Sequence, residues 1–171
     1  GTVYIDSDDF RLDEDPNFYR MTPAQPVGLK YQGGNLVCRE VIKDGAKVKE
    51  LKCLLDTTAG RPKPKAHITW VPSDGISCEV RIYNHLFTEP EPSDRWEEEL
   101  NPESEIVHPH AIVDPSVLPL VDKKFVDKWT SNQALQFERF GYFVVDVDTT
   151  FDSTTMEGKL VFNRTVSLKE D

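Results

Sequence analysis

Short segments of alternating apolar and polar residues, separated by turn signals, constrain the fold of this chain more than any other feature. In SCEVRIY, Ser77 to Tyr83, the apolar side chains fall on every second position, which is the period of a half-buried strand. Leu36–Ile42 and Val48–Leu55 flank Asp44-Gly45, a pair typical of a tight hairpin turn. The pattern predicts an all-β fold, with antiparallel strands closed into one or two barrels. Further strands are expected at Thr2–Asp6, Val27–Tyr31, Ala66–Val71, Gln136–Val147 and Leu160–Leu168.

The middle of the chain has a different pattern. Pro90 and Pro92 break the strand periodicity, and Asp94 three residues before Glu97 resembles a helix-capping pair. We therefore expect one short helix there, ending before Asn101-Pro102. Prolines at 109, 115 and 119 then predict an irregular return to the strands.

Composition places the chain among folded proteins of one domain or two small ones. It has 171 residues, of which 38% are hydrophobic and 29% charged, and no apolar run is long enough to span a membrane. The strand-like segment directly after Gly1 indicates a piece of a longer protein. Three widely spaced cysteines, Cys38, Cys53 and Cys78, lie in strand-like segments, so we expect buried, reduced thiols without a disulfide, in the cytoplasm.

The formal net charge of −10 argues against broad, non-specific binding of nucleic acid, which needs many phosphate contacts. A local site is still compatible with this charge, because the charges are segregated along the chain. Acidic residues crowd positions 6–15 and 97–99, while basic residues cluster at 43–52 and 61–65. Each run can equally be a solvated surface.

No catalytic signature occurs in the sequence: there is no phosphate-cradling glycine loop, nucleophile elbow or zinc-protease motif. His108-Pro109-His110 is the only close histidine pair, and we interpret it as a surface loop. Glu138 with Asp146 is conceivable as an acid–base pair, but nothing around these residues supports it. We therefore expect no catalytic residue, metal or cofactor in this segment.

The stretch QFERFGYFVVDV, Gln136 to Val147, combines planar polar groups with aromatic rings. Gln136 and Arg139 stand among four aromatic residues, and Gly141 predicts a bulge or bend. Proteins that read unstacked bases need aromatic rings for stacking and planar donors for base edges. The same residues also fit a core strand preceded by two ordinary polar residues. The stretch alone leaves both interpretations open.

Six segments taken together resemble one family, the glutaminyl-tRNA synthetases. They are similar, in the same order, to the C-terminal anticodon-binding region of that class I ligase, and the runs QPVGL and KPKA are typical of its eukaryotic branch. The segments are VYIDSDDF (Val3–Phe10), AQPVGLKY (Ala24–Tyr31), KPKAHITWV (Lys63–Val71), CEVRIYNHLF (Cys78–Phe87), QFERFGYF (Gln136–Phe143) and GKLVFNRTVSLKED (Gly158–Asp171).

The resemblance implies two antiparallel β-barrels, a distal one over residues 16–87 and a proximal one combining 1–15 with 88–171. Part of the proximal barrel and the catalytic domain, with its ATP and glutamine sites, would lie upstream of this chain. The chain would then be the non-catalytic part of an ATP-dependent glutamine–tRNA ligase. Its implied partners are glutamine tRNA and the catalytic domain of the same polypeptide, with neither membrane nor DNA.

The resemblance also implies which residues read the anticodon. Gln136 and Arg139 match the pair that reads the central base, a uridine, and Arg20 matches the arginine that reads the third base, a guanosine. The Arg fork suits guanine because it fits O6 and N7 together. Lys30 matches a basic position near the first base, and Asn17 stands where bacterial members carry a polar or basic group.

Tyr19 and Gly28 depart from the basic and polar residues of bacterial members, which leaves the reading of the first base open. Because anticodon bases are adjacent in one loop, we expect Arg20 to open onto the same surface as Gln136 and Arg139. Two alternatives are kept: another β-barrel RNA-binding protein of the ribosomal type, and a β-domain whose acidic faces bind a protein partner.

Overall fold

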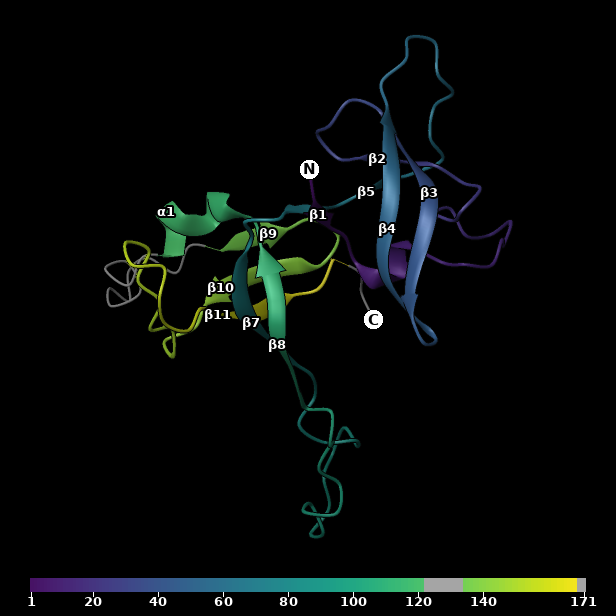
Figure 1. Ribbon diagram of the computed structural model, residues 1–171. Coiled ribbons are helices and arrows are strands. Elements are labelled where there is room, and N and C mark those ends of the chain that lie inside the picture. Colours follow the sequence, from purple (N-terminus) through teal and green to yellow (C-terminus); the bar gives the residue numbers. More distant parts are fainter. Residues whose placement is uncertain (122–133, 169–171) are drawn as a thin grey trace. The chain divides into compact units, whose positions relative to one another are not determined.

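A computed structural model describes residues 1–121 and 134–168, and these residues form a nearly all-β structure (Figure 1). The expected fold class is confirmed. The chain divides into two compact units, Gly1–Ser73 and Asp74–Asp171, and each is described by itself. None of the described helices is long and apolar enough to cross a membrane.

Unit 1 contains a four-stranded sheet in the order β4-β3-β2-β5. Its pairs are antiparallel except β2 with β5, which run parallel. The core beneath it consists of Met21, Val27, Leu29, Cys38 and Ile68. The elements are β1 (Val3–Tyr4), η1 (Ser7–Asp9), β2 (Val27–Leu29), β3 (Asn35–Asp44), β4 (Lys47–Asp56), β5 (His67–Ile68) and β6 (Val71–Pro72), of which β1 and β6 pair separately.

The long β3–β4 hairpin is the one that Asp44-Gly45 predicts. Gly45 takes the left-handed conformation that the turn needs, with φ of 60°. Two bulges interrupt the ladder, one at Lys49 on β4 and one at Arg39 on β3. Since each bulge adds one residue to a different strand, the second restores the register that the first shifts.

Unit 2 contains a five-stranded sheet in the order β8-β7-β11-β10-β9, with β7 and β11 parallel and the other neighbours antiparallel (Figure 1). The strands are β7 (Ile76–Tyr83), β8 (Glu105–Val113), β9 (Leu135–Phe137), β10 (Gly141–Val145) and β11 (Val161–Val166), and η2 (Pro115–Val117) runs into the single turn α1 (Leu118–Val121). Their core residues are Ile76, Cys78, Val113, Val117, Val121, Phe143, Phe151, Leu160 and Phe162.

The expectation of irregular chain around Pro109 is wrong, because Glu105–Val113 forms β8. This strand tolerates a proline because it is an edge strand, and because Pro109 and His110 together oppose a single residue of β7. His108 and His110 are exposed residues of this strand rather than of a loop.

The expected helix at 94–100 is also wrong. Residues 94–99 form successive turns, with Glu98 N donating to Arg95 O at 2.9 Å, in a segment that projects beyond the β7–β8 pair (Figure 1). The Ser93 N–H and hydroxyl both bind the Glu99 carboxylate, and these bonds lower the pKa of Glu99. Trp96 and Leu100 remain exposed. So short a helix needs a buried face, which this segment lacks.

The hydrogen-bonded ladders of the described strands form open sheets, and no closed barrel is detected among these residues, although the arrangement is compatible with β-barrel domains. The division between units falls at 73/74, whereas the resemblance implies a distal barrel over 16–87. The reason is β7, which pairs with β8 and β11 of unit 2. The barrel boundaries stay a prediction.

All three cysteines are free thiols. Cys38 and Cys78 are buried as expected, but Cys53 is exposed, so that part of the expectation is wrong. Cys53 belongs to β4, the edge strand of its sheet, most of whose residues are exposed.

Candidate nucleic-acid interface

Gln136 and Arg139 belong to a tight hairpin rather than to one continuous strand. β9 and β10 pair antiparallel, and Gln136 is the direct cross-strand partner of Tyr142. Side chains of directly opposite residues lie on the same face. Both residues are exposed, so an amide and a phenol ring stand together on the edge hairpin of the sheet. Such a pair offers a hydrogen-bonding group beside a stacking surface.

The turn of this hairpin, residues 138–140, carries Arg139 and Phe140. Phe140 N donates to Phe137 O at 3.0 Å, and Arg139 has a φ of 73°. That left-handed conformation is uncommon for a residue other than glycine and often marks functional turns. The Arg139 side chain is half-buried and engaged in an interaction, while the Phe140 ring is 45% exposed.

Gly141 makes this turn possible. Its φ is 142°, and a Cβ on it would lie 2.5 Å from the carbonyl oxygen of Val166 on β11. No other residue fits there without a shift of the backbone. The bend that Gly141 predicts in the sequence is therefore present, as a full reversal of the chain.

An aromatic cluster holds the hairpin on unit 2. The Phe137 ring packs on Phe143 with centroids 4.7 Å apart and meets the edge of Phe162 at 5.2 Å. Phe143 and Phe162 are buried, so β9 is anchored from its inner face. The outer face, with Gln136, is thus presented by a fixed backbone.

In unit 1, Arg20 forms an ion pair with a buried carboxylate. Its Nη1 lies 3.1 Å from Asp9 Oδ1 and donates to the Asp8 carbonyl at 3.3 Å. The Asp9 side chain is fully buried, whereas that of Arg20 is 41% exposed. Both contacts use Nη1. Arg20 therefore has a structural task and still reaches the surface.

The loop before Arg20 is fixed from below by Gln25. Gln25 Nε2 donates to Phe18 O at 2.9 Å and to Arg20 O at 2.6 Å. Asn17 and Tyr19 are exposed on this loop, and the Asn17 N–H donates to the Asp15 carboxylate at 2.8 Å. The backbone of the loop is thus held in place while the side chains of Asn17 and Tyr19 face solvent.

Lys30 lies directly after β2, and both its backbone N–H and its carbonyl are hydrogen-bonded. Its N–H donates to Ile68 O at 3.0 Å, and its carbonyl accepts from Trp70 Nε1 at 2.8 Å. The next residue, Tyr31, has a φ of 64° and a side chain that is 88% exposed. This ring is the most exposed aromatic of the described chain, and the sequence motifs gave no reason to expect it.

His67 explains the glycine at position 28. A Cβ on Gly28 would lie 2.4 Å from His67 Cδ2, so the imidazole ring occupies the space where a longer side chain would start. His67 also borders a hollow of about 340 Å³ between two loops of unit 1. Its lining contains no acidic residue and consists of Gln32, Gly33, Gly34, Asn35, Gly60, Arg61, Pro62, Lys63, Pro64 and His67. Sequence reasoning noted the basic run at 61–65 but not this hollow.

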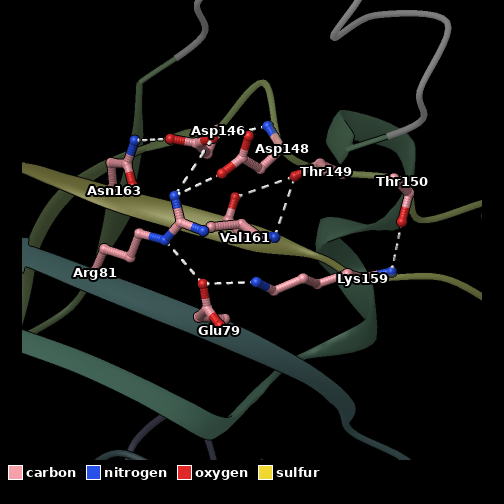
Figure 2. Close-up of polar contacts among 9 residues, drawn as sticks. All are labelled: Glu79, Arg81, Asp146, Asp148, Thr149, Thr150, Lys159, Val161 and Asn163. Carbon is pink, nitrogen blue, oxygen red and sulfur yellow. Dashed lines mark hydrogen bonds and ion pairs between the residues drawn. The ribbon is translucent and has the colours of Figure 1, made fainter.

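In unit 2, Arg81 and Lys159 lie in a polar cluster with the carboxylates of Glu79, Asp146 and Asp148 (Figure 2). Arg81 donates from Nε to Glu79 at 2.8 Å and from Nη1 to Asp148 at 2.8 Å, with Asp146 Oδ1 at 3.9 Å. Lys159 Nζ lies 2.9 Å from Glu79 Oε1. Hydrogen bonds and ion pairs to Lys159 and Arg81 lower the pKa of Glu79, so it stays ionised.

Asp146 is likewise committed to structure. It accepts from Asn163 Nδ2 and, at 2.7 Å, from the Asp148 N–H. These bonds fix the turn after β10. Among the described residues no group of three or more His, Cys, Asp or Glu side chains could hold a metal ion.

These features define a class of protein: a β-rich module that presents exposed aromatic rings beside amide and guanidinium groups. Comparison with known proteins identifies the family. Residues 67–146 match the family described as tRNA synthetases class I (E and Q), anti-codon binding domain, and this part of the chain belongs to that family. The expectation drawn from the six motifs is confirmed.

Its relatives align along nearly the whole chain. A probable glutamine–tRNA ligase of Dictyostelium discoideum is 41% identical over 174 residues, covering 99% of this chain and 20% of the relative. The glutamine–tRNA ligase of Bos taurus is 40% identical over 178 residues, covering 100% and 21%, and that of Nitrobacter winogradskyi is 36% identical over 177 residues, covering 98% and 29%. This chain therefore spans only about a fifth to a third of the length of these relatives.

Proposed function

We propose that this chain binds the anticodon loop of glutamine tRNA, with Gln136 and Arg139 at the central uridine. The observation that carries the proposal is the β9–β10 hairpin, where an exposed amide lies opposite an exposed ring and beside a left-handed arginine turn. Uridine presents planar acceptor and donor groups on its Watson–Crick edge, which an amide and a guanidinium can satisfy. Tyr142 or Phe140 supplies the stacking surface.

Unit 1 supplies the remaining contacts in this proposal. Arg20 reads the third base, a guanosine, from a side chain that is 41% exposed while it pairs with Asp9. Lys30 acts near the first base, and Asn17 lies on the exposed loop before Arg20. The exposed rings of Tyr19 and Tyr31 support this assignment, because splayed bases stack on aromatic side chains.

The activity proposed for the whole polypeptide is ATP-dependent ligation of glutamine to its tRNA. Support comes from the names of the relatives, which this chain matches from end to end while covering only part of their length. In this proposal the reaction takes place in a catalytic domain of the same polypeptide, and the present segment contributes no reacting group. The cytoplasm is the proposed compartment, supported by the three free thiols.

Binding measurements with matched tRNAs test the proposal. At fixed salt, the chain should bind glutamine tRNA more tightly than the same tRNA altered at the central anticodon base. Arg139→Ala should reduce the ratio of the two affinities by about ten- to a hundredfold, which is the discrimination that one good base contact provides. Alanine and arginine both carry a Cβ, so the substitution adds no strain to the left-handed backbone at this position.

Arg95→Ala is the matched control, since Arg95 is an exposed arginine of the same unit whose ion-pair partner, Glu98, lies in the turns at 94–99. It should leave both affinities unchanged. If Arg139→Ala weakens the two tRNAs equally, Arg139 contacts phosphate rather than the base. Equal binding of glutamine tRNA and unrelated tRNAs would favour a general RNA-binding barrel, and binding of no tRNA would favour the protein-interaction alternative.

A further inference from the structure

Two of the three cysteines face each other across the β3–β4 hairpin. Cys38 and Cys53 are direct Cα partners in the antiparallel ladder, so their side chains lie on the same face of the hairpin. The Cys38 Sγ also lies 3.8 Å from the Glu40 carbonyl. The pair keeps the register that the turn sets at Asp44 and Lys47, because the bulges at Arg39 and Lys49 compensate each other.

The backbone geometry at this pair suits a covalent link. Directly opposite residues of antiparallel strands have Cα atoms about 4.5–5.5 Å apart, whichever type of pair they form. A disulfide needs Cα atoms about 4.4–6.8 Å apart. Closing the bond therefore asks for rotation of two side chains and little movement of the backbone.

The two thiols differ in solvent exposure, and this difference determines which of them reacts first with a reagent from solution. Cys53 is exposed on the edge strand β4, whereas Cys38 is buried in the core of unit 1. A small reagent therefore reaches Cys53 first, and Cys38 is the cross-strand neighbour of the position where an adduct would form. Cys78 is buried in the separate core of unit 2.

We propose that Cys38 and Cys53 form an oxidisable dithiol that closes reversibly to a cross-strand disulfide. The oxidant is a low-molecular-weight disulfide, RSSR, of the glutathione type. The Cys53 thiolate attacks one sulfur of RSSR, giving a mixed disulfide and releasing RS⁻. The Cys38 thiolate then attacks Cys53 Sγ, forming the protein disulfide and releasing a second RS⁻. Two protein thiols are oxidised, one RSSR is reduced to two RSH, and the two thiol protons go to the released thiolates.

The inference is independent of tRNA binding and can be tested on the chain alone. The folded protein is incubated with glutathione disulfide at pH 8, quenched with acid, alkylated in denaturant and mapped by mass spectrometry. The expected product is a Cys38–Cys53 cross-linked peptide that has lost two hydrogen atoms, with Cys78 still alkylated. Excess dithiothreitol should restore both thiols.

Cys38→Ser is the informative variant, because it removes the resolving thiol and keeps the exposed one. It should accumulate glutathione on Cys53, while the natural chain should not. Cys53→Ser, a change at an exposed position, should leave Cys38 unmodified under the same conditions. Circular dichroism checks that both variants fold.

Three results would overturn the inference. One is a persistent glutathione adduct on Cys53 of the natural chain, since Cys38 would then fail to resolve it. Another is the absence of any Cys38–Cys53 cross-link from the folded chain. The third is a cross-link that involves Cys78 as often as Cys38, which would indicate scrambling through unfolded protein rather than reaction of a preformed pair.

Discussion

Arg20 has two tasks in unit 1. Its guanidinium forms an ion pair with the buried Asp9, and its partly exposed side chain is proposed to read the third anticodon base. Arg20→Ala removes the ion pair that Arg20 makes with the fully buried Asp9. We expect the free energy of unfolding to fall by about 3 kcal/mol, at the lower end of the range for broken buried pairs because Arg20 is partly exposed. Chemical denaturation followed by circular dichroism measures this loss.

Arg20→Lys separates the two tasks. Lysine keeps a positive charge for Asp9 but lacks the planar fork that fits guanine. It should retain most of the stability and lose discrimination at the third anticodon base. If Arg20→Ala is as stable as the natural chain, the ion pair with Asp9 has no structural value.

Cys53 should be slow to react at neutral pH despite its exposure. Desolvation, followed by the neighbouring Cys38 thiol, raises its pKa to about 11. Because only the thiolate reacts, alkylation by iodoacetamide should accelerate about tenfold per pH unit up to that pKa. A rate that levels off near pH 8.5 would show an ordinary, unperturbed thiol.

Sequence reasoning found residues of the right chemistry but not their surroundings. Gln136 and Arg139 were recognisable as planar polar groups among aromatics, yet the left-handed turn of Arg139 depends on the tight reversal before Gly141. The pairing of Asp9 with Arg20 joins residues on either side of an irregular loop, and no periodic pattern encodes such a contact. The roles of these residues in reading bases stay predictions.

At the scale of elements, the β9–β10 hairpin should depend on Gly141. Gly141→Ala forces a Cβ against the Val166 carbonyl at a φ that suits only glycine. We expect a loss of about 2–4 kcal/mol in the free energy of unfolding, from backbone strain together with the clash. The variant should also lose discrimination at the central base, because Gln136 and Arg139 sit on the hairpin.

Gly45→Ala is the matched control for this change. Gly45 also has a positive φ, 60°, but nothing lies within 4 Å of the added Cβ. It should cost only about 1 kcal/mol, the strain of a left-handed alanine. Equal losses for the two variants would mean that the contact with Val166 contributes nothing.

The Glu79 cluster should make the stability of unit 2 fall in acid. Lys159 and Arg81 lower the pKa of Glu79 from its ordinary value of 4.5. The stabilisation is therefore present above about pH 4.5 and lost as pH falls through the lower folded-state pKa. Glu79→Gln removes the titrating group, so its free energy of unfolding should depend less on pH in this window. An unchanged pH dependence would contradict a role for the cluster.

Elements with strong local signals were predictable, and elements set by tertiary contacts were not. The β3–β4 hairpin follows from Asp44-Gly45 and its flanking strands. β8 was missed because its proline is acceptable only at a bulged edge, a position that the sequence does not reveal. The opposite error occurred at 94–100, where a capping pair preceded a segment with no core to pack against.

For the whole molecule, fold class and family were accessible from the sequence because they depend on patterns spread over many segments. The division at 73/74 was not, since it depends on the parallel pairing of β7 with β11, which are about eighty residues apart in the chain. The net charge of −10 likewise limits where RNA can bind. A local site with few phosphate contacts predicts a shallow dependence of affinity on salt.

The proposed contacts of Arg20 and Arg139 with glutamine tRNA should contribute independently to the binding free energy. Arg20 lies in unit 1 and Arg139 in unit 2, and each is assigned a different anticodon base. Binding of glutamine tRNA to the two single variants, Arg20→Lys and Arg139→Ala, and to the double variant forms a double-mutant cycle. Because separate contacts add, the losses in binding free energy should sum to within about 0.5 kcal/mol.

Two tRNAs, each altered at one base, complete the experiment. The tRNA changed at the third base should be insensitive to Arg20→Lys but still sensitive to Arg139→Ala, and the tRNA changed at the central base should show the reverse. This crossed pattern can arise only if each arginine reads its own base. If both variants instead weaken every tRNA alike, the two arginines act on the phosphate backbone, and base reading must be assigned to other residues.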